Sequence, residues 1–289
     1  MKRIALVSLV LSACGGGQKP QSQPQPQPDP IAQPDTTPAP PAAPPVAKGN
    51  PREDLIPRSV LFGNPERAGV QLSHDGKYLS WLAPKDGVMN VWVAPVGKLD
   101  QAKAVTSDTK RPIRGYSWAY TNKHILYMQD LAGDENFHVF RADVTDGKTT
   151  DLTPFEGTRA SIEGLSYKQP NVAIMSMNDR NKQVFDLYRV DLTTGERKLV
   201  VQNDDGYVGF TLDNDMKPRM AAKKQPDGST HVFLAEGKGG TITWKPWEQI
   251  PFEDADTTSV VAFAPNNKSV FIQETRGRDT GALVQLDLA

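Results

Sequence analysis

A six-residue strand pattern recurs five times along this chain at nearly equal intervals. The central residues of the five copies are Trp92, Phe140, Tyr188, Phe233 and Val284. They lie 48, 48, 45 and 51 residues apart. Self-similarity at a nearly fixed period indicates a protein that is built from repeated structural units.

Each copy follows another short apolar segment at an almost constant distance. The centres of these earlier segments are Trp81, Tyr127, Met175, Ala221 and Ile272, and the steps to the next centres are 11, 13, 13, 12 and 12 residues. A constant step of this length predicts a repeated β-hairpin. Asp-Gly pairs at 75–76, 86–87, 146–147, 205–206 and 227–228, together with Gly195, supply residues that tolerate positive φ where strands reverse.

Two further strands complete each unit, one after the hairpin and one that leads into the next repeat. In the first unit these are residues 104–106 and 115–120. Four strands in a unit of this length are typical of a β-propeller blade. The aromatic residues among the five repeat centres, Trp92, Phe140, Tyr188 and Phe233, are then expected to be core residues between blades. We therefore predict that residues 51–289 form an all-β fold, an incomplete β-propeller of about four and a half four-stranded blades, in which the fifth blade is half built.

Composition excludes several function classes. Lys and Arg total 33 and Asp and Glu total 34, so no broad basic field is present that would attract nucleic acid. Cys14 is the only cysteine, which excludes an intrachain disulfide, a cysteine zinc cluster and a thiol catalyst in the folded part. We predict no nucleic-acid partner, no metal site and no cofactor.

The first 14 residues have the pattern of a secretory leader. Lys2 and Arg3 form a positive start, and residues 4–11 are apolar but too few to span a bilayer. The tetrad that ends at Cys14 resembles the processing box of bacterial lipoproteins, in which the cysteine becomes the lipidated first residue. This resemblance implies a lipid-anchored protein of the cell envelope, at the outer membrane and facing the periplasm because Gly15 follows the cysteine. An ordinary leader with an incidental cysteine is the alternative, and it would place the protein free in the periplasm.

Residues 15–50 are mostly Gly, Gln, Pro and Ala. Such a segment has too little apolar surface to offset the entropy of ordering, and its prolines favour an extended chain. We predict a disordered linker that separates the folded part from the membrane. A proline-rich ligand for a partner protein is the alternative.

The start of the folded part resembles a known family. Residues 55–67, residues 72–79 with Asp75 and Gly76, and residues 124–138 are similar to the propeller of bacterial prolyl oligopeptidase family serine peptidases, of the dipeptidyl aminopeptidase and acylaminoacyl peptidase type. The similarity extends from about Arg52 to the C-terminus. His74 departs from it, because blade starts of this kind usually carry proline.

In that family a propeller covers an α/β-hydrolase domain that holds a Ser, Asp, His triad. This sequence contains no Gly-x-Ser-x-Gly nucleophile motif, and its nearest serine context, around Ser117, lacks the second glycine. We therefore expect no catalytic residue and no peptidase activity in this chain alone. The resemblance implies that it is the N-terminal propeller of a membrane-tethered peptidase and restricts the access of peptide substrates to a catalytic domain. A stand-alone envelope lipoprotein that binds a protein partner is the alternative.

Four groups of residues are candidates for binding sites. The acidic pair Asp134 and Glu135 would suit a peptide amino terminus, although a solvated turn is the simpler interpretation. His138 and His231 occupy corresponding strand positions but belong to different units, so packing is favoured over metal binding. Trp244 and Trp247 form either an exposed aromatic platform or a wedge between blades. The oxygen-rich residues Asn203, Asp204, Asp205, Asp213, Asn214 and Asp215 could bind calcium, but their spacing does not follow the calcium loop and favours solvated loops.

Overall fold

The computed structural model describes residues 55–237 and 242–288. The predicted signal peptide with Cys14, and the predicted linker, lie outside these residues. The described residues from Pro57 onward form one compact unit. Its described part contains one short α-helix, α1 (Arg58–Phe62), two 3-10 helices, η1 (Leu99–Gln101) and η2 (Phe252–Asp254), and 19 strands.

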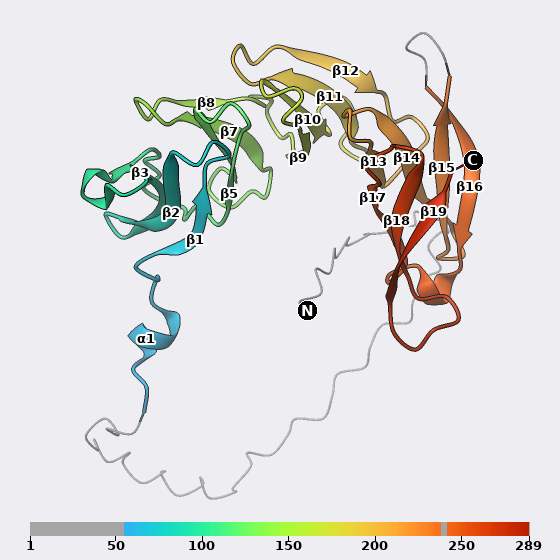
Figure 1. Ribbon diagram of the computed structural model, residues 1–289, viewed down its shortest axis with the longest axis horizontal. Coiled ribbons are helices and arrows are strands. Elements are labelled where there is room, and N and C mark those ends of the chain that lie inside the picture. The colour runs from blue at the N-terminus through green and yellow to red at the C-terminus, as the bar shows by residue number, and fades with distance from the viewer. Residues whose placement is uncertain (1–54, 238–241, 289) are drawn as a thin grey trace, which may run out of the picture. The chain divides into compact units, whose positions relative to one another are not determined.

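The strands form five antiparallel sheets, and within each sheet the strands are hydrogen-bonded in chain order (Figure 1). Sheet 1 contains β1 (Ala68–Leu72), β2 (Tyr78–Lys85), β3 (Val88–Pro95) and β4 (Lys103–Ala104). Sheet 2 contains β5 (Tyr116–Trp118), β6 (His124–Gln129), β7 (His138–Asp143) and β8 (Thr149–Asp151). Sheet 3 contains β9 (Ala160–Leu165), β10 (Val172–Met177), β11 (Asp186–Asp191) and β12 (Arg197–Val201).

Sheet 4 contains β13 (Gly209–Leu212), β14 (Pro218–Lys224), β15 (Thr230–Glu236) and β16 (Thr243–Ile250). Sheet 5 has three strands among the described residues, β17 (Ser259–Phe263), β18 (Ser269–Glu274) and β19 (Ala282–Asp287). The predicted all-β fold of repeated four-stranded sheets is confirmed, and sheet 5 has one strand fewer than the others among the described residues.

The predicted hairpins are confirmed in register. In all five sheets, the two residues taken as strand centres are direct partners in the pairing of the second strand with the third. These partners are Trp81 with Trp92, Tyr127 with Phe140, Met175 with Tyr188, Ala221 with Phe233, and Ile272 with Val284. The tightest turn lies between β2 and β3, where Asp86 and Gly87 have φ values of 52° and 83°, as a two-residue hairpin loop requires.

The assignment of strands to units needs one correction. The strands predicted to end each unit, such as residues 115–120, do not pair with the hairpin before them. Instead β5, β9, β13 and β17 each pair with the hairpin that follows. Each sheet therefore starts one strand earlier than predicted, and sheet 5 contains three strands instead of two. Asp205 and Gly206 accordingly connect sheets 3 and 4 and are not part of a hairpin.

The hydrophobic core lies between the sheets, in four clusters that each join two sheets consecutive in the chain. Sheet 3 shows the arrangement most clearly, because all six residues of β10 are buried. Ala173, Met175 and Met177 pack toward sheet 2, whereas Val172 and Ile174 pack toward sheet 4. A strand that is buried on both faces has a nearly continuous run of apolar residues. The sequence of β10, VAIMSM, has this pattern.

The two end sheets differ from the middle ones. In sheet 5, Val260 and Phe263 pack toward sheet 4, whereas Val261 and Leu283 are 55% and 69% exposed. In sheet 1, Trp81 and Trp92 belong to a small cluster on the face that does not pack on sheet 2. Trp92 was expected between two sheets, so its place on this outer face is a correction. Phe140 and Tyr188 do pack between sheets, as predicted.

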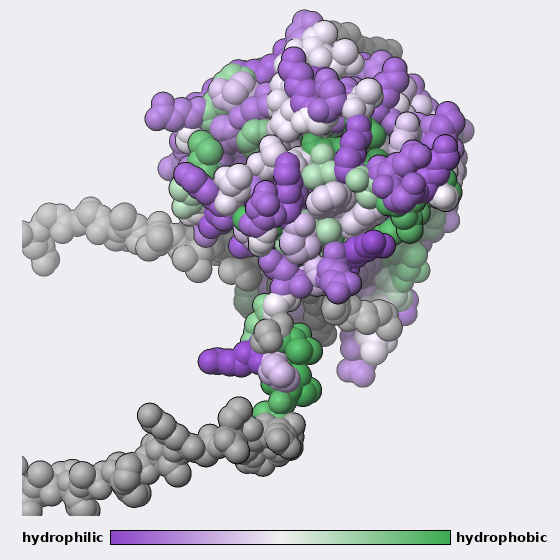
Figure 2. Space-filling model, turned by 90° about the vertical axis from the view of Figure 1, so that its left-hand side faces the viewer, coloured by the Kyte–Doolittle hydropathy of each residue, from purple (hydrophilic) through white to green (hydrophobic). Residues whose placement is uncertain are grey.

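The hydrophobic side chains of α1 are exposed. Val60, Leu61 and Phe62 are between 57% and 79% exposed. Figure 2 shows hydrophobic residues in the narrow segment below the folded body, whereas the face of the body turned to the viewer is mostly polar, with scattered hydrophobic residues. Among the described residues, no helix combines the length and hydropathy needed to cross a membrane.

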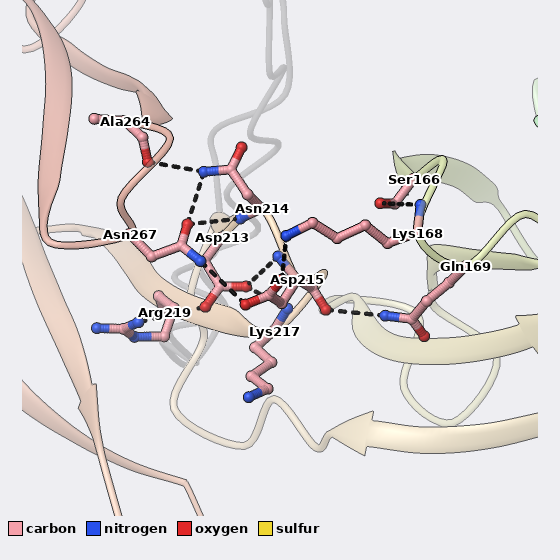
Figure 3. A network of polar contacts seen from close by, with 10 residues as sticks. All are labelled: Ser166, Lys168, Gln169, Asp213, Asn214, Asp215, Lys217, Arg219, Ala264 and Asn267. Carbon is pink, nitrogen blue, oxygen red and sulfur yellow. Dashed lines mark hydrogen bonds and ion pairs between the residues drawn. The ribbon is translucent and has the colours of Figure 1, made fainter. Parts of the chain in front are cut away.

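Polar contacts between turns hold the sheets at one end (Figure 3). The turn of sheet 4 contacts both of its neighbours. Lys168 of sheet 3 donates to Asp215 Oδ1 at 2.6 Å, and Asn214 N–H donates to Asn267 Oδ1 of sheet 5 at 3.0 Å. The hydrogen bond and charge of Lys168 lower the pKa of Asp215. At the corresponding turn of sheet 1, the ring of His74 stacks on Tyr120 of sheet 2 with centroids 3.9 Å apart.

A second polar contact joins sheets 4 and 5. Glu274 accepts hydrogen bonds from Nε and Nη2 of Arg276 at 2.8 and 2.6 Å, and Arg276 Nη1 donates to Glu248 of β16 at 2.9 Å. These bonds to Arg276, chiefly those from its side chain, lower the pKa of Glu274 from 4.5 to about 2. Because the folded state binds the Glu274 proton less tightly than the unfolded state does, its contribution is complete above pH 4.5 and is lost as pH falls toward 2.

We expect Glu274→Gln to lower the free energy of unfolding at pH 7 by about 1–3 kcal/mol. The difference between wild type and variant should shrink between pH 4.5 and about 2, because wild-type Glu274 then becomes protonated. Urea denaturation at several pH values measures both effects, and Glu253→Gln, at an exposed glutamate of the same sheet junction, is the control. A difference that stays constant across this pH range would contradict the assignment.

Candidate functional site

A cavity of about 470 Å³ lies between sheets 2 and 3, and we call it the arginine pocket. It is lined by residues of β5, β6 and β9 and by the loops that precede β5, β7 and β9. Met128 and Ile162 form half-buried apolar walls, and Leu126 is buried beneath them. Phe137 supplies an aromatic wall from the loop before β7. The pocket therefore combines an apolar interior with the ends of several strands.

Four charged side chains line the arginine pocket, and two of them neutralise each other. Arg111 donates from Nε and Nη2 to the two carboxylate oxygens of Asp130, at 3.0 and 3.1 Å. The Asp130 side chain is fully buried, whereas that of Arg111 is 35% exposed. A two-point contact of this kind fixes the guanidinium plane as well as its position. Arg111 and Asp130 thus form a fixed wall of the pocket.

The loop that carries Arg111 is fixed by a second carboxylate. Asp108 accepts from the N–H of Arg111 at 2.9 Å and from Gln129 Nε2 at 2.8 Å. Burial acts to raise the pKa of Asp108, but the hydrogen bonds from Arg111, Lys110 and Gln129 together lower it. Asp108 therefore stays ionised and holds the loop against the end of β6.

Arg114 and Arg159 are the other two charged residues of the pocket, and both are exposed. Within residues 55–237 and 242–288, neither guanidinium pairs with a carboxylate. The guanidinium of Arg159 lies 5.9 Å from the centre of the Phe137 ring, at the margin of a cation–π contact. After Arg111 and Asp130 cancel, the pocket keeps the positive charge of these two arginines.

Sequence patterns did not reveal the arginine pocket, but one predicted candidate lies beside it. Asp134 and Glu135 belong to the loop between Asp130 and Phe137, both of which line the pocket. Asp134 is exposed and accepts hydrogen bonds from Asn136, as a turn residue does. Glu135 has a φ of 60° and donates its N–H to Asp130 at 3.3 Å. The structure thus places the acidic pair at the edge of the pocket, on the loop that shapes it.

The two histidines lie in different sheets. His138 Nδ1 is 2.7 Å from Asp151 Oδ2 of the neighbouring strand, and His231 belongs to β15.

The oxygen-rich residues between Asn203 and Asp215 form hydrogen bonds in separate turns. Asn203 is buried and bonds to the loop around Tyr207, whereas Asp213 caps its own turn by accepting from Lys217 N–H at 3.0 Å. Across the described ranges, no three His, Cys, Asp or Glu side chains are grouped as a metal site.

Trp244 and Trp247 pack against different sheets. Trp244 contacts Tyr207 and Phe210 at the junction of sheets 3 and 4, and Trp247 packs into the cluster between sheets 4 and 5. Pro246 lies between them on edge strand β16, where the pairing register shifts. The tryptophans therefore act as wedges between sheets, which is the second of the two predicted alternatives.

The repeated sheets, packed face to face with the last one incomplete, define a partial β-propeller. Over 236 residues the chain is 45% identical to "Dipeptidyl aminopeptidase BIII" of Pseudoxanthomonas mexicana, a match that covers 82% of this chain and 34% of that protein. It is 30% identical over 243 residues to "Dipeptidyl peptidase family member 6" of Caenorhabditis elegans, which covers 80% of this chain and 33% of that protein. The expected resemblance to the propeller portion of this peptidase family is confirmed.

Other comparisons add less. The chain spans about a third of the length of the two curated relatives that it matches. No protein-family model matches it. Among solved structures, TolB from Acinetobacter baumannii aligns with a TM-score of 0.42 and 15% identity, over 76% of this chain and 56% of that chain.

We expect Arg111→Gln to destabilise the protein by about 3–5 kcal/mol, because it leaves the buried Asp130 carboxylate without its partner. Arg114→Gln is the matched control. Arg114 lines the same pocket but is exposed, so its replacement should change the free energy of unfolding by less than about 0.5 kcal/mol. Urea denaturation of both variants measures the difference. Equal stability of the two would show that the Arg111–Asp130 contact does not support the fold.

Proposed function

We propose that this chain is the propeller part of a membrane-tethered serine peptidase of the prolyl oligopeptidase family. In the full-length protein it restricts which peptides reach a catalytic α/β-hydrolase domain that lies outside these 289 residues. The observation that carries the proposal is the 45% identity to a dipeptidyl aminopeptidase over 82% of the chain. The match covers 34% of that relative, so the activity of the full-length protein is part of the proposal.

The role proposed for this part of the protein is to select peptide substrates and not to catalyse their hydrolysis. The sequence holds no Gly-x-Ser-x-Gly motif, so the nucleophile, base and oxyanion hole of such a reaction have to come from another part of the protein. The five sheets, each packed face to face on the next in the chain, provide a rigid frame for such a selective role. Peptides are the proposed substrates because one curated relative is named a dipeptidyl aminopeptidase and the other a member of a dipeptidyl peptidase family.

Hydrolysis of dipeptidyl chromogenic substrates tests this proposal. The full-length product of the gene should release the chromophore, and a serine-directed fluorophosphonate should stop it. This chain alone should give no turnover above buffer. Turnover by this chain that the fluorophosphonate blocks, or a gene that does not continue past the codon for Ala289 into a nucleophile motif, would contradict the proposal.

Membrane tethering is proposed from the leader. Lipidation of Cys14 would hold the mature protein at the cell envelope, because several acyl chains anchor far more firmly than one. Cells fed an alkyne-labelled fatty acid should incorporate label into the wild type and not into the Cys14→Ser variant. The variant should also leave the membrane fraction. Label in the Cys14→Ser variant, or unlabelled wild type, would refute the anchor.

A further inference from the structure

The arginine pocket has the two properties that a ligand with one charged and one apolar part requires. Its interior offers Leu126, Met128, Ile162 and Phe137, and its volume of about 470 Å³ lies within the range of small-ligand pockets, roughly 300–1,000 Å³. Arg114 and Arg159 stand at the same pocket with no carboxylate partner among the described residues. The apolar surface would bind a side chain, and the guanidinium groups would bind an anion.

The local charge favours a carboxylate over a cation. Arg111 and Asp130 satisfy each other, so the charge that remains in the pocket is that of Arg114 and Arg159. Asp134 and Glu135 lie on the adjoining loop but do not line the pocket. A guanidinium group has a planar set of donors that matches the two oxygens of a carboxylate.

We propose that the arginine pocket binds the carboxylate of an acidic peptide, with a neighbouring apolar side chain of the peptide seated against Met128 and Ile162. The choice of a peptide as the ligand rests on the proposed function. The carboxylate can belong to an acidic side chain or to the C-terminus of the peptide. In either case Arg114 and Arg159 give this part of the protein a preference of its own for acidic over neutral peptides.

Three N-acetylated peptides distinguish the two possible sources of the carboxylate. The first is acetyl-Ala-Phe-Glu-Ala-amide, which carries only an acidic side chain. The second replaces Glu by Gln and is neutral. The third is the Gln peptide with a free C-terminal carboxylate. Binding of each to this chain is measured by isothermal titration calorimetry at low and moderate salt, with no need for catalytic activity.

We expect at least one of the two acidic peptides to bind tenfold or more tightly than the neutral peptide, with an affinity that weakens as salt rises. Whichever acidic peptide binds identifies the source of the carboxylate. Arg114→Gln and Arg159→Gln should each weaken that binding at least fivefold. Arg278→Gln, at an exposed arginine of the loop between β18 and β19, should leave it unchanged.

Loss of folding is separated from loss of binding by the melting temperature. Neither Arg114 nor Arg159 makes a side-chain hydrogen bond to the described residues, so both variants should melt like the wild type. Equal binding of acidic and neutral peptides, binding of none of the three, or binding of a mononucleotide in preference to the acidic peptides would overturn the proposal. None of these results bears on whether the full-length protein hydrolyses dipeptidyl substrates, so the two proposals fail separately.

Discussion

The structure depends on burial of apolar surface between one β-sheet and the next. A four-stranded sheet of this size has two faces, and a single sheet cannot bury either of them alone. Sheet 3 packs against sheet 2 on one face and against sheet 4 on the other, which is why every residue of β10 is buried. Sheets 1 and 5 have one such neighbour each among the described residues. Their outer faces, with Trp92 in one and Leu283 in the other, follow from the same constraint.

The arginine pocket is a consequence of this packing. Where sheets 2 and 3 meet, the apolar residues Met128 and Ile162 continue the core toward the ends of the strands. The loops before β5 and β9 then bring Arg114 and Arg159 to the same place, although they are far apart in the chain. The Arg111–Asp130 pair, whose aspartate is fully buried, forms another wall of the same pocket. A rigid, repeated frame thus carries a local and non-repeated site, as is common for proteins in which function resides in loops.

The repeat was predictable from the sequence because strands and hairpins are local. The spacing of Trp81 and Trp92, or of Met175 and Tyr188, depends on one turn, and the predicted partners are direct neighbours in the sheet. The limits of each sheet were harder to predict. Residues 115–120 lie between two hairpins, and only hydrogen bonds over a longer distance decide which of them they join. The pocket was not predictable at all, since Arg114 and Arg159 meet across two sheets and no motif links them.

Hydrogen exchange measured along the chain tests the central claim most directly. If burial between sheets stabilises the protein, the amides of β10, which is covered on both faces, should be among the slowest to exchange and should open only with global unfolding. Those of β19, which has one exposed face and lies at the edge of sheet 5, should exchange much faster. Equal protection of β10 and β19, or faster exchange in β10, would contradict the account.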